Sequence, residues 1–437
     1  MTSLLERYFR SVEKSQPWRW RGQVTESIGQ TIESAGPPAS VGECCEIADR
    51  SGRRHRAEVI GFRGSHVVSM PLETTKGVRL GDAVWGLGTR PEIDVGPAWM
   101  GRVVDAEGFP IDGNGAMAGE TTMLLDCAVR SPLARAPIRA PLGTGIRAID
   151  ALLTVGRGQR VGIFGGSGVG KSTLIGMMTR NTEAEVTVVG LVGERGREVG
   201  EFLEQSLGKE GRKRAVVMVA TSDESPVKRM RAALGATAVA ESFAAQGRHV
   251  LLVLDSLTRF AMAAREIGLA AGEPPTAKGY TPSVFTRLAR LVERAGNFQT
   301  GSITAFYTVL MEGDDQQDPL VDAVRSLLDG HVVLSRALAA EGWYPPIEVL
   351  DSISRLMPAV TDEQHREQAA LVRRLMATYA RSEDLVRIGA YKPGADAELD
   401  RAIRARSAMR GFLTQDAREE VRFADGIERL AALAREV

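Results

Sequence analysis

The sequence is poor in cysteine and aromatic residues, and its charges cancel. The three cysteines, Cys44, Cys45 and Cys127, form no CxxC spacing, and the five histidines form no ligand pair. This pattern gives little support to a metal or redox centre and favours reduced thiols in a cytosolic protein. The 55 basic residues equal the 55 acidic ones, so the overall charge indicates neither a nucleic-acid nor a membrane-surface partner.

Long apolar runs are also missing. No stretch reaches the roughly 18 apolar residues of a membrane-spanning helix, and the N-terminus lacks a signal-peptide core. We therefore expect a cytoplasmic protein, unless a partner recruits it elsewhere. The composition is 43% hydrophobic and 25% charged over 437 residues, which is typical of a soluble globular chain of about three domains.

Local patterns divide the chain into four segments. Apolar residues at helical spacing predict an N-terminal helix in residues 1–20, either packed on its own body or docking another protein. Short β-like runs between Gly and Pro predict a small closed barrel over 21–92. Strands alternating with helical stretches over 93–358 predict a mainly parallel sheet covered by helices on both faces. Residues 359–437 are predicted to form a helical domain, with breaks at Gly389, at Pro393-Gly394 and near Gly411. The strands expected in the sheet include Arg160–Phe164, Val186–Val192, Ala215–Ala220, Val250–Leu254, Ser302–Val309 and His331–Leu334.

The segment GGSGVGKS matches the P-loop pattern GxxxxGK[ST] and stands between an apolar strand and a helix. Glycines let the backbone N–H groups turn inward around a triphosphate, and the helix N-terminus adds its dipole. Lys171 would neutralise the β- and γ-phosphates, and the Ser172 hydroxyl would bind Mg²⁺. The sequence thus predicts an ATP·Mg²⁺ site. The residues predicted to bind the nucleotide here are Gly165, Gly166, Ser167, Gly168, Val169, Gly170, Lys171, Ser172 and Thr173.

Asp255 follows the apolar run VLLVL. An acid at the end of a buried strand behind a P-loop can hold the water shell of Mg²⁺, although many strands end in Asp as a turn or cap. Arg259, one helical turn later, either reaches phosphate or forms a structural salt bridge.

Glu194 ends a second apolar run and is followed by Arg195 and Glu198. Hydrolysis needs a carboxylate that orients and polarises the attacking water. An isolated cluster of acidic and basic residues is usually a solvated turn, but this one follows a buried strand. We expect Glu194 to be catalytic, and Glu198 to join Ser172 and Asp255 around the metal.

Several segments together resemble one family. They are GTGIRAIDALLTVGRGQRVGIFGGSGVGKSTLIGMM, GERGREV, LDSLTRFAMA, GEPPTAKGYTPSVF, EGDDQQDP, DGHVVLSR and SISRLMP. The chain resembles the flagellum-specific and type III secretion export ATPases, relatives of the catalytic subunit of rotary ATP synthases, from about residue 20 to about residue 405. EGDDQQDP and GAYKPGADAELDRAI resemble the flagellar branch. The resemblance implies a RecA-like central domain.

The resemblance also implies roles for matching residues. Glu194 would be the catalytic carboxylate, with Arg195 as a γ-phosphate contact. Asp255 would be the Walker B acid, and Arg259 a second arginine that senses phosphate.

Two more roles are implied nearer the C-terminus. Tyr344, in WYPP, resembles the aromatic residue that lies against adenine, although a tyrosine there can also be core. Arg355, in SISR, would be an arginine finger reaching into the neighbouring subunit's site. From the residues alone, Arg355 is more often a salt-bridge partner.

The implied function is that of a homo-hexameric ATPase, peripheral at the inner face of the cell membrane, that powers protein export. It would release chaperones from export substrates and unfold those substrates. The implied partners are a stator-like regulator, a central stalk, an export gate and chaperone–substrate complexes.

Three other functions compete with this one. A catalytic subunit of a rotary ATP synthase or ion pump is disfavoured by EGDDQQDP and the short helical C-terminus. A hexameric RNA translocase would need interleaved aromatic and basic residues, and the barrel segment offers only Phe62 and Trp85 without that pattern. A non-catalytic nucleotide-binding subunit is disfavoured by Glu194.

The sequence departs from the family pattern in one region. Thr281 and Ala289 stand where proline is usual, and the loop over 296–301 is short. We expect these departures to affect coupling to partners more than hydrolysis.

Overall fold

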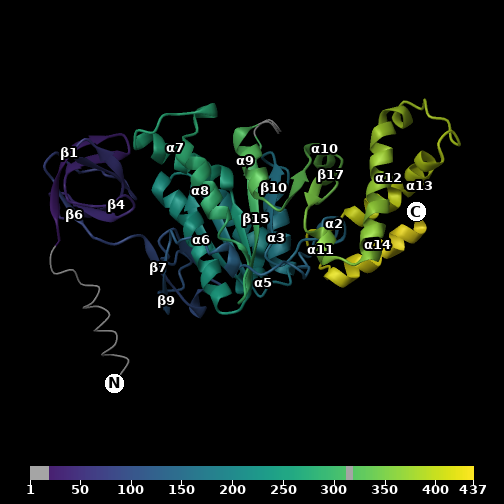
Figure 1. Cartoon of the computed structure of the whole chain (residues 1–437), viewed down its shortest axis with the longest axis horizontal. Coiled ribbons are helices and arrows are strands. Elements are labelled where there is room, and N and C mark those ends of the chain that lie inside the picture. The colour runs from purple at the N-terminus through teal and green to yellow at the C-terminus, as the bar shows by residue number, and fades with distance from the viewer. Residues whose placement is uncertain (1–18, 312–317) are drawn as a thin grey trace, which may run out of the picture.

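The computed structural model describes residues 19–311 and 318–437. The helix expected in residues 1–20 lies almost entirely outside the described residues, as does most of EGDDQQDP. Three parts follow one another along the long axis of the molecule: a barrel, a sheet between helices, and a helical C-terminal part (Figure 1). This arrangement confirms the predicted fold class.

Six short antiparallel strands close the N-terminal barrel in the order β1-β2-β5-β4-β3-β6. Its small interior is filled by aliphatic side chains such as Val24, Ile32 and Ile47, because alternate residues of each strand point inward. The predicted small closed barrel is confirmed. Its strands are β1 (Arg21–Ile28), β2 (Thr31–Ala35), β3 (Cys44–Ala48), β4 (Arg54–Arg63), β5 (His66–Pro71) and β6 (Ala83–Gly86).

The central sheet has the order β17-β16-β10-β15-β13-β11-β12-β8. Each neighbouring pair is parallel except β16 and β17. The six strands listed from the sequence are all present; β8 and the antiparallel edge strand β17 were not expected. The strands are β8 (Val103–Asp105), β10 (Arg160–Gly165), β11 (Val186–Glu194), β12 (Ala215–Thr221), β13 (His249–Asp255), β15 (Ser302–Leu310), β16 (Gly330–Leu334) and β17 (Ile347–Ser354), with the short β14 (Gly296–Asn297) beside β15.

Helices cover both faces of this sheet (Figure 1). On β13, Leu252 and Leu254 pack in one apolar cluster with α6, α7, α8 and α9, whereas Leu251 and Val253 pack in the other with α2 and α3. Successive strand residues point to opposite faces, so a strand buried on both sides must be continuously apolar. The helices are α2 (Arg147–Leu152), α3 (Lys171–Asn181), α4 (Gly196–Glu201), α5 (Gly208–Lys213), α6 (Pro226–Ala245), α7 (Leu257–Ala270), α8 (Pro282–Val292), α9 (Pro319–Leu327) and α10 (Arg336–Ala340).

The C-terminal part packs on the sheet domain through α2. The side chain of Gln415 accepts a hydrogen bond from Arg147 N (2.9 Å) and donates one to Gly145 O (2.8 Å). The break expected near Gly411 lies three residues further on, since α13 runs through Gly411 to Leu413 and the chain leaves the helix at Thr414. The helices are α11 (Met357–Val360), α12 (Glu363–Arg387), α13 (Ala397–Leu413) and α14 (Phe423–Glu436).

The remaining elements connect these parts. They are β7 (Glu92–Val95), which pairs with β9 (Thr121–Leu124), the short helical turns η1 (Pro97–Trp99), η2 (Pro132–Ala134) and η4 (Ala277–Gly279), and the π-helical η3 (Phe202–Leu207). Within the described residues, no helix is long and apolar enough to cross a membrane.

A buried ion pair holds α6 against the end of α8. Arg294 and Glu241 form two hydrogen bonds, of 2.9 and 2.6 Å, and their side chains are 2% and 8% exposed. Removing one partner leaves an uncompensated buried charge. We expect Glu241→Ala to lower the free energy of unfolding by about 3–5 kcal/mol, measured by denaturant unfolding. Glu210→Ala, which breaks the exposed pair with Lys213, should cost less than about 1 kcal/mol; similar losses in both variants would contradict this account.

Candidate active site

The loop between β10 and α3 has the local geometry of a phosphate cradle. Gly168 and Gly170 have φ of +80° and +93°, values that residues with side chains rarely adopt. Helix α3 begins at Lys171, and the buried Lys171 ammonium donates to the carbonyl oxygens of Gly165 (2.9 Å) and Gly166. The loop thus places the positively charged Lys171 side chain at the N-terminus of α3.

A cavity of about 630 Å³ opens above this loop at the carboxyl edge of the sheet. Four strands lie side by side here in the order β10-β15-β13-β11. The residues that follow their carboxyl ends therefore meet at one edge of the sheet. Of the predicted residues, those lining the cavity are Ser167, Gly168, Gly170, Lys171, Ser172, Thr173, Glu194, Arg195, Glu198, Asp255 and Arg259. Gly165, Gly166 and Val169 belong to the loop but do not line the cavity.

Sequence reasoning missed five residues of this cavity: Thr258, Met262, Leu310, Met311 and Arg336. Thr258 supports the wall, because its hydroxyl accepts a hydrogen bond from Leu310 N (2.8 Å). Arg336 follows β16, the parallel neighbour of β10, and a basic residue placed just beyond a buried strand was the available signal.

Asp255 is the last residue of β13 and is buried. Its Oδ1 accepts a hydrogen bond from the Thr308 hydroxyl (2.6 Å), which fixes the orientation of the carboxyl group. Burial raises the pKa of Asp255, while hydrogen bonding to Thr308 and the charge of Lys171 oppose the rise.

Glu194 is the last residue of β11 and is partly buried. Burial, the charge of Asp255, and a hydrogen bond and charge from Glu198 raise the pKa of Glu194 to about 8, against an opposing effect of Arg259. A carboxylate with a raised pKa is a better proton acceptor once ionised. The position and the electrostatics therefore suit a general base.

Two arginines supply positive charge to the cavity. Arg259 lies in the first turn of α7, and its buried Nε has no hydrogen-bond partner among the described residues. Arg195 is exposed at the start of α4 and lies 3.9 Å from Glu198. An unpaired buried donor beside an anion-binding loop fits a ligand rich in phosphate oxygens.

The acidic side chains fit Mg²⁺ that arrives with a nucleotide. Among the described residues, no group of three or more His, Cys, Asp or Glu is arranged to hold a metal ion alone. Mg²⁺ in nucleotide sites keeps several waters and takes only one or two protein ligands besides phosphate. Ser172, Asp255 and Glu198 line the cavity as candidate ligands.

Tyr344 lies outside the phosphate cavity but next to it. It is 50% exposed and lines a second cavity of about 470 Å³ that also contains Gly170 and Thr173 of the loop. Pro346 and Gln415 form other parts of its wall. A shallow pocket with an aromatic wall next to the phosphate loop is suited to a planar base.

Arg355 lies far from both cavities of its own chain. It follows β17, whose Ser354 pairs with Gly330, which in turn pairs with Val161 near the start of β10. The phosphate loop begins at the other end of β10, five residues from Arg160, about 17 Å at roughly 3.3 Å per residue. Arg355 is exposed and forms no ion pair with another described residue.

The fold and the cavity define a P-loop nucleotide hydrolase with a barrel on one side of its sheet domain and a helical part on the other. The nucleotide-binding domain of the ATP synthase alpha/beta family matches residues 145–354, and the beta-barrel domain of that family matches residues 24–88. The T3SS EscN ATPase C-terminal domain matches residues 361–432.

Relatives that match nearly the whole chain define the class of protein more closely. A flagellum-specific ATP synthase of Treponema pallidum is 53% identical over 98% of this chain and 96% of its own length. A type 3 secretion system ATPase of Xanthomonas euvesicatoria is 49% identical over 90% of this chain and 89% of its own length. The structure of the assembled ATPase EscN from enteropathogenic E. coli is 43% identical, with a TM-score of 0.89 over 94% of this chain and 100% of that one.

The chain therefore belongs to the family of flagellar and type III secretion ATPases. It is an ATP-hydrolysing enzyme whose activity energises export, as the sequence predicted.

The pKa of Glu194 generates a prediction about pH. Glu194 must be ionised to accept a proton, so kcat/KM should fall as pH drops below its pKa. Glu198→Gln removes a charge that raises this pKa, so the acid limb of kcat/KM should move to lower pH, measured from about pH 5 to pH 9. Glu201→Gln changes a carboxylate of the same helix that pairs with Arg197 outside the cavity and should leave the limb in place. An unmoved limb in Glu198→Gln would contradict the assignment.

Proposed function

We propose that this chain is a homo-hexameric ATPase of a flagellar export apparatus, in which each ATP site is completed by Arg355 of the neighbouring subunit. The observation that carries the proposal is the position of Arg355, exposed and a full strand length from its own phosphate loop. An arginine finger supplied in trans stabilises transition-state charge and raises turnover by about 10³–10⁵-fold, so assembly would switch activity on.

The side chains of one subunit take distinct parts in this proposal. Lys171 and the loop N–H groups hold the β- and γ-phosphates, while Glu194 orients the water and accepts its proton. Arg259 and Arg195 contact the γ-phosphate. Ser172, Asp255 and Glu198 would hold the Mg²⁺ that arrives with ATP, and that ion would neutralise phosphate charge.

Tyr344 contributes to nucleotide binding. It would pack against the adenine ring in the second cavity, whose wall joins the phosphate loop at Gly170 and Thr173. A half-exposed aromatic ring already in place binds a base at low entropic cost.

The flagellar assignment is supported by the segments EGDDQQDP and GAYKPGADAELDRAI, and by flagellum-specific relatives that include one from Salmonella typhimurium, 49% identical over 94% of this chain and 92% of its own length. The rotary ATP synthase alternative is disfavoured, because the C-terminal helices match the EscN-type domain over residues 361–432.

The partners and location follow from the same proposal. EscN has been solved in an assembled form and in complex with its central stalk EscO, which supports a homo-oligomer with a stalk partner here. A stator-like regulator, an export gate and chaperone–substrate complexes would be the other partners. The ATPase would lie in the cytoplasm, peripheral at the inner face of the cell membrane, where it releases chaperones and unfolds substrates.

Glu194→Gln tests the catalytic carboxylate. The amide keeps the shape of the side chain but cannot accept a proton, so we expect kcat to fall about a hundredfold or more while ATP binding is retained. Turnover by phosphate release and binding of a fluorescent nucleotide measure the two effects. Persistent hydrolysis in this variant would place the base on another residue.

Mixing two inactive variants tests the finger. Arg355→Ala subunits keep a complete phosphate loop, and Lys171→Ala subunits keep the finger, so mixed assemblies contain some complete sites. We expect each variant alone to lose about 10³-fold in kcat and the mixture to regain a measurable fraction of wild-type turnover. Absence of any rescue in assemblies shown to be mixed would refute action in trans.

A further inference from the structure

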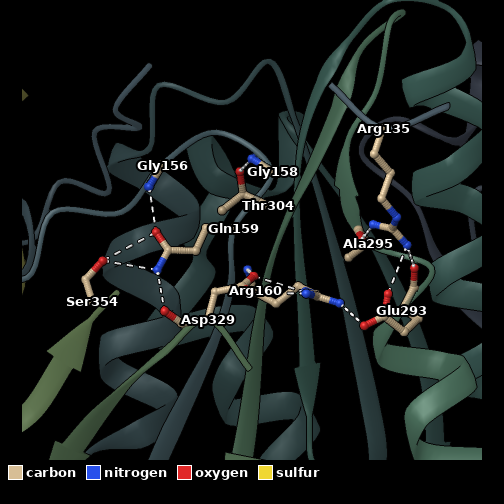
Figure 2. A network of polar contacts seen from close by, with 10 residues as sticks. All are labelled: Arg135, Gly156, Gly158, Gln159, Arg160, Glu293, Ala295, Thr304, Asp329 and Ser354. Atoms are coloured by element: carbon tan, nitrogen blue, oxygen red, sulfur yellow. Dashed lines mark hydrogen bonds and ion pairs between the residues drawn. The ribbon is translucent and has the colours of Figure 1, made fainter. Parts of the chain in front are cut away.

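Gln159 connects three segments of chain at the amino-terminal edge of the sheet (Figure 2). Its Oε1 accepts a hydrogen bond from Gly156 N (2.8 Å), and its Nε2 donates to Ser354 Oγ (3.1 Å) and to Asp329 O (3.2 Å). The residue is fully buried. Both amide hydrogens and the amide oxygen are therefore used, and the side chain has one orientation.

Two of these three segments hold the main chain of Arg355. Asp329 O accepts the hydrogen bond from Arg355 N (3.0 Å) as well as the one from Gln159. Ser354 immediately precedes Arg355, and its hydroxyl also donates to Thr154 O (2.8 Å). The amide of Gln159 thus bridges the residue before Arg355 and the carbonyl that anchors Arg355.

Asp329, whose carbonyl oxygen anchors Arg355, is also held by Arg160. The guanidinium donates through Nε to Asp329 Oδ2 (3.0 Å) and through Nη2 to Asp329 Oδ1 (3.1 Å). A two-pronged pair of this kind fixes geometry as well as charge. The position of the Asp329 carbonyl is consequently set by two neighbouring residues at the start of β10.

Close packing leaves little room for adjustment here. A Cβ on Gly330 would lie 2.5 Å from Ile353 O and 3.1 Å from Ser354 Cα. The start of β16 and the end of β17 therefore touch backbone to backbone, and a displacement of Asp329 is passed on to Ser354 and Arg355.

The polar network continues from Arg160 away from Arg355, through Glu293 and Arg135, which we call its outer arm. Glu293, which caps the end of α8, forms ion pairs with Arg160 and with Arg135 (3.1 Å for the latter). Figure 2 shows this arm on the opposite side of Arg160 from Gln159. It contacts neither Ser354 nor Arg355 directly, so it offers a matched control within the same network.

We propose that Gln159 is a positioning residue for the Arg355 finger and thereby serves the active site of the neighbouring subunit. Gln159 itself immediately precedes β10, the strand that leads into the phosphate loop of its own subunit. The inference rests on the proposed role of Arg355 in trans. A finger must reach a developing charge within a fraction of an ångström, and a misplacement of 1 Å can cost about a hundredfold in rate.

The competing account is that Gln159 only stabilises its own subunit or supports its own phosphate loop through β10. The two accounts predict opposite results in mixed assemblies. Loss of the finger alone leaves the subunit's own site intact, whereas loss of its own site leaves its finger intact.

The test uses Gln159→Met, which keeps the length of the side chain but removes the hydrogen bonds of its amide, and Ser354→Ala, which removes the partner hydroxyl. In the full-length assembled enzyme we expect kcat to fall about tenfold to a hundredfold, with KM for ATP and nucleotide affinity unchanged. Glu293→Gln, in the outer arm, should reduce kcat less than threefold. If Gln159→Met does not fold, Ser354→Ala gives the same readout. A rise in KM with unchanged kcat would overturn the proposal.

Mixing decides between the accounts. A mixture of Gln159→Met with Lys171→Ala subunits should regain turnover, because the Lys171→Ala subunits supply an intact finger. A mixture of Gln159→Met with Arg355→Ala subunits should stay inactive, because neither subunit supplies one. The reverse pattern would overturn the positioning role: turnover in the mixture of Gln159→Met with Arg355→Ala, and none in the mixture of Gln159→Met with Lys171→Ala. The mixture of Arg355→Ala with Lys171→Ala is the separate check on the finger itself. If that mixture alone is active, only the Gln159 inference has failed. If it is inactive, the proposed function has failed, and the Gln159 inference fails with it.

Discussion

The rigid length of strand β10 separates two functional groups of one chain. Its carboxyl end leads into the phosphate loop at Gly165, and its amino end, through β16 and β17, holds Arg355. Parallel strands buried on both faces do not bend enough to bring the two ends together. With the finger role that we propose for Arg355, a complete site needs two subunits, and hydrolysis would be a property of the assembly.

The same sheet explains why the phosphate end can be prepared in a single chain. Glu194 and Asp255 end neighbouring strands. Burial raises the pKa of both carboxyl groups, and the charge of Asp255 adds to the rise at Glu194. Lys171 and Arg259 partly offset this effect. A nucleotide and its Mg²⁺ bring the countercharges that such a cluster lacks. One subunit thus has the features needed to bind ATP, and in our proposal the neighbouring subunit supplies Arg355 for turnover.

The sequence predicted those features of the site that depend on local order along the chain. A loop pattern after an apolar strand identified Lys171 and Ser172, and strand-ending acids identified Glu194 and Asp255. It could not predict Gln159, whose side chain bonds residues 170 and 195 positions away. Edge strand β17 was missed because it is only partly buried. The helix break expected near Gly411 lies at Thr414, because packing of α13 outweighs the low helix propensity of glycine.

Turnover per subunit as a function of protein concentration, with assembly followed in the same samples by sedimentation, tests the central claim most directly. The account predicts that isolated subunits bind ATP but hydrolyse it slowly, and that turnover per subunit rises in step with the assembled fraction. Full turnover in subunits shown to be monomeric would contradict it, because a site completed by a neighbour cannot work alone.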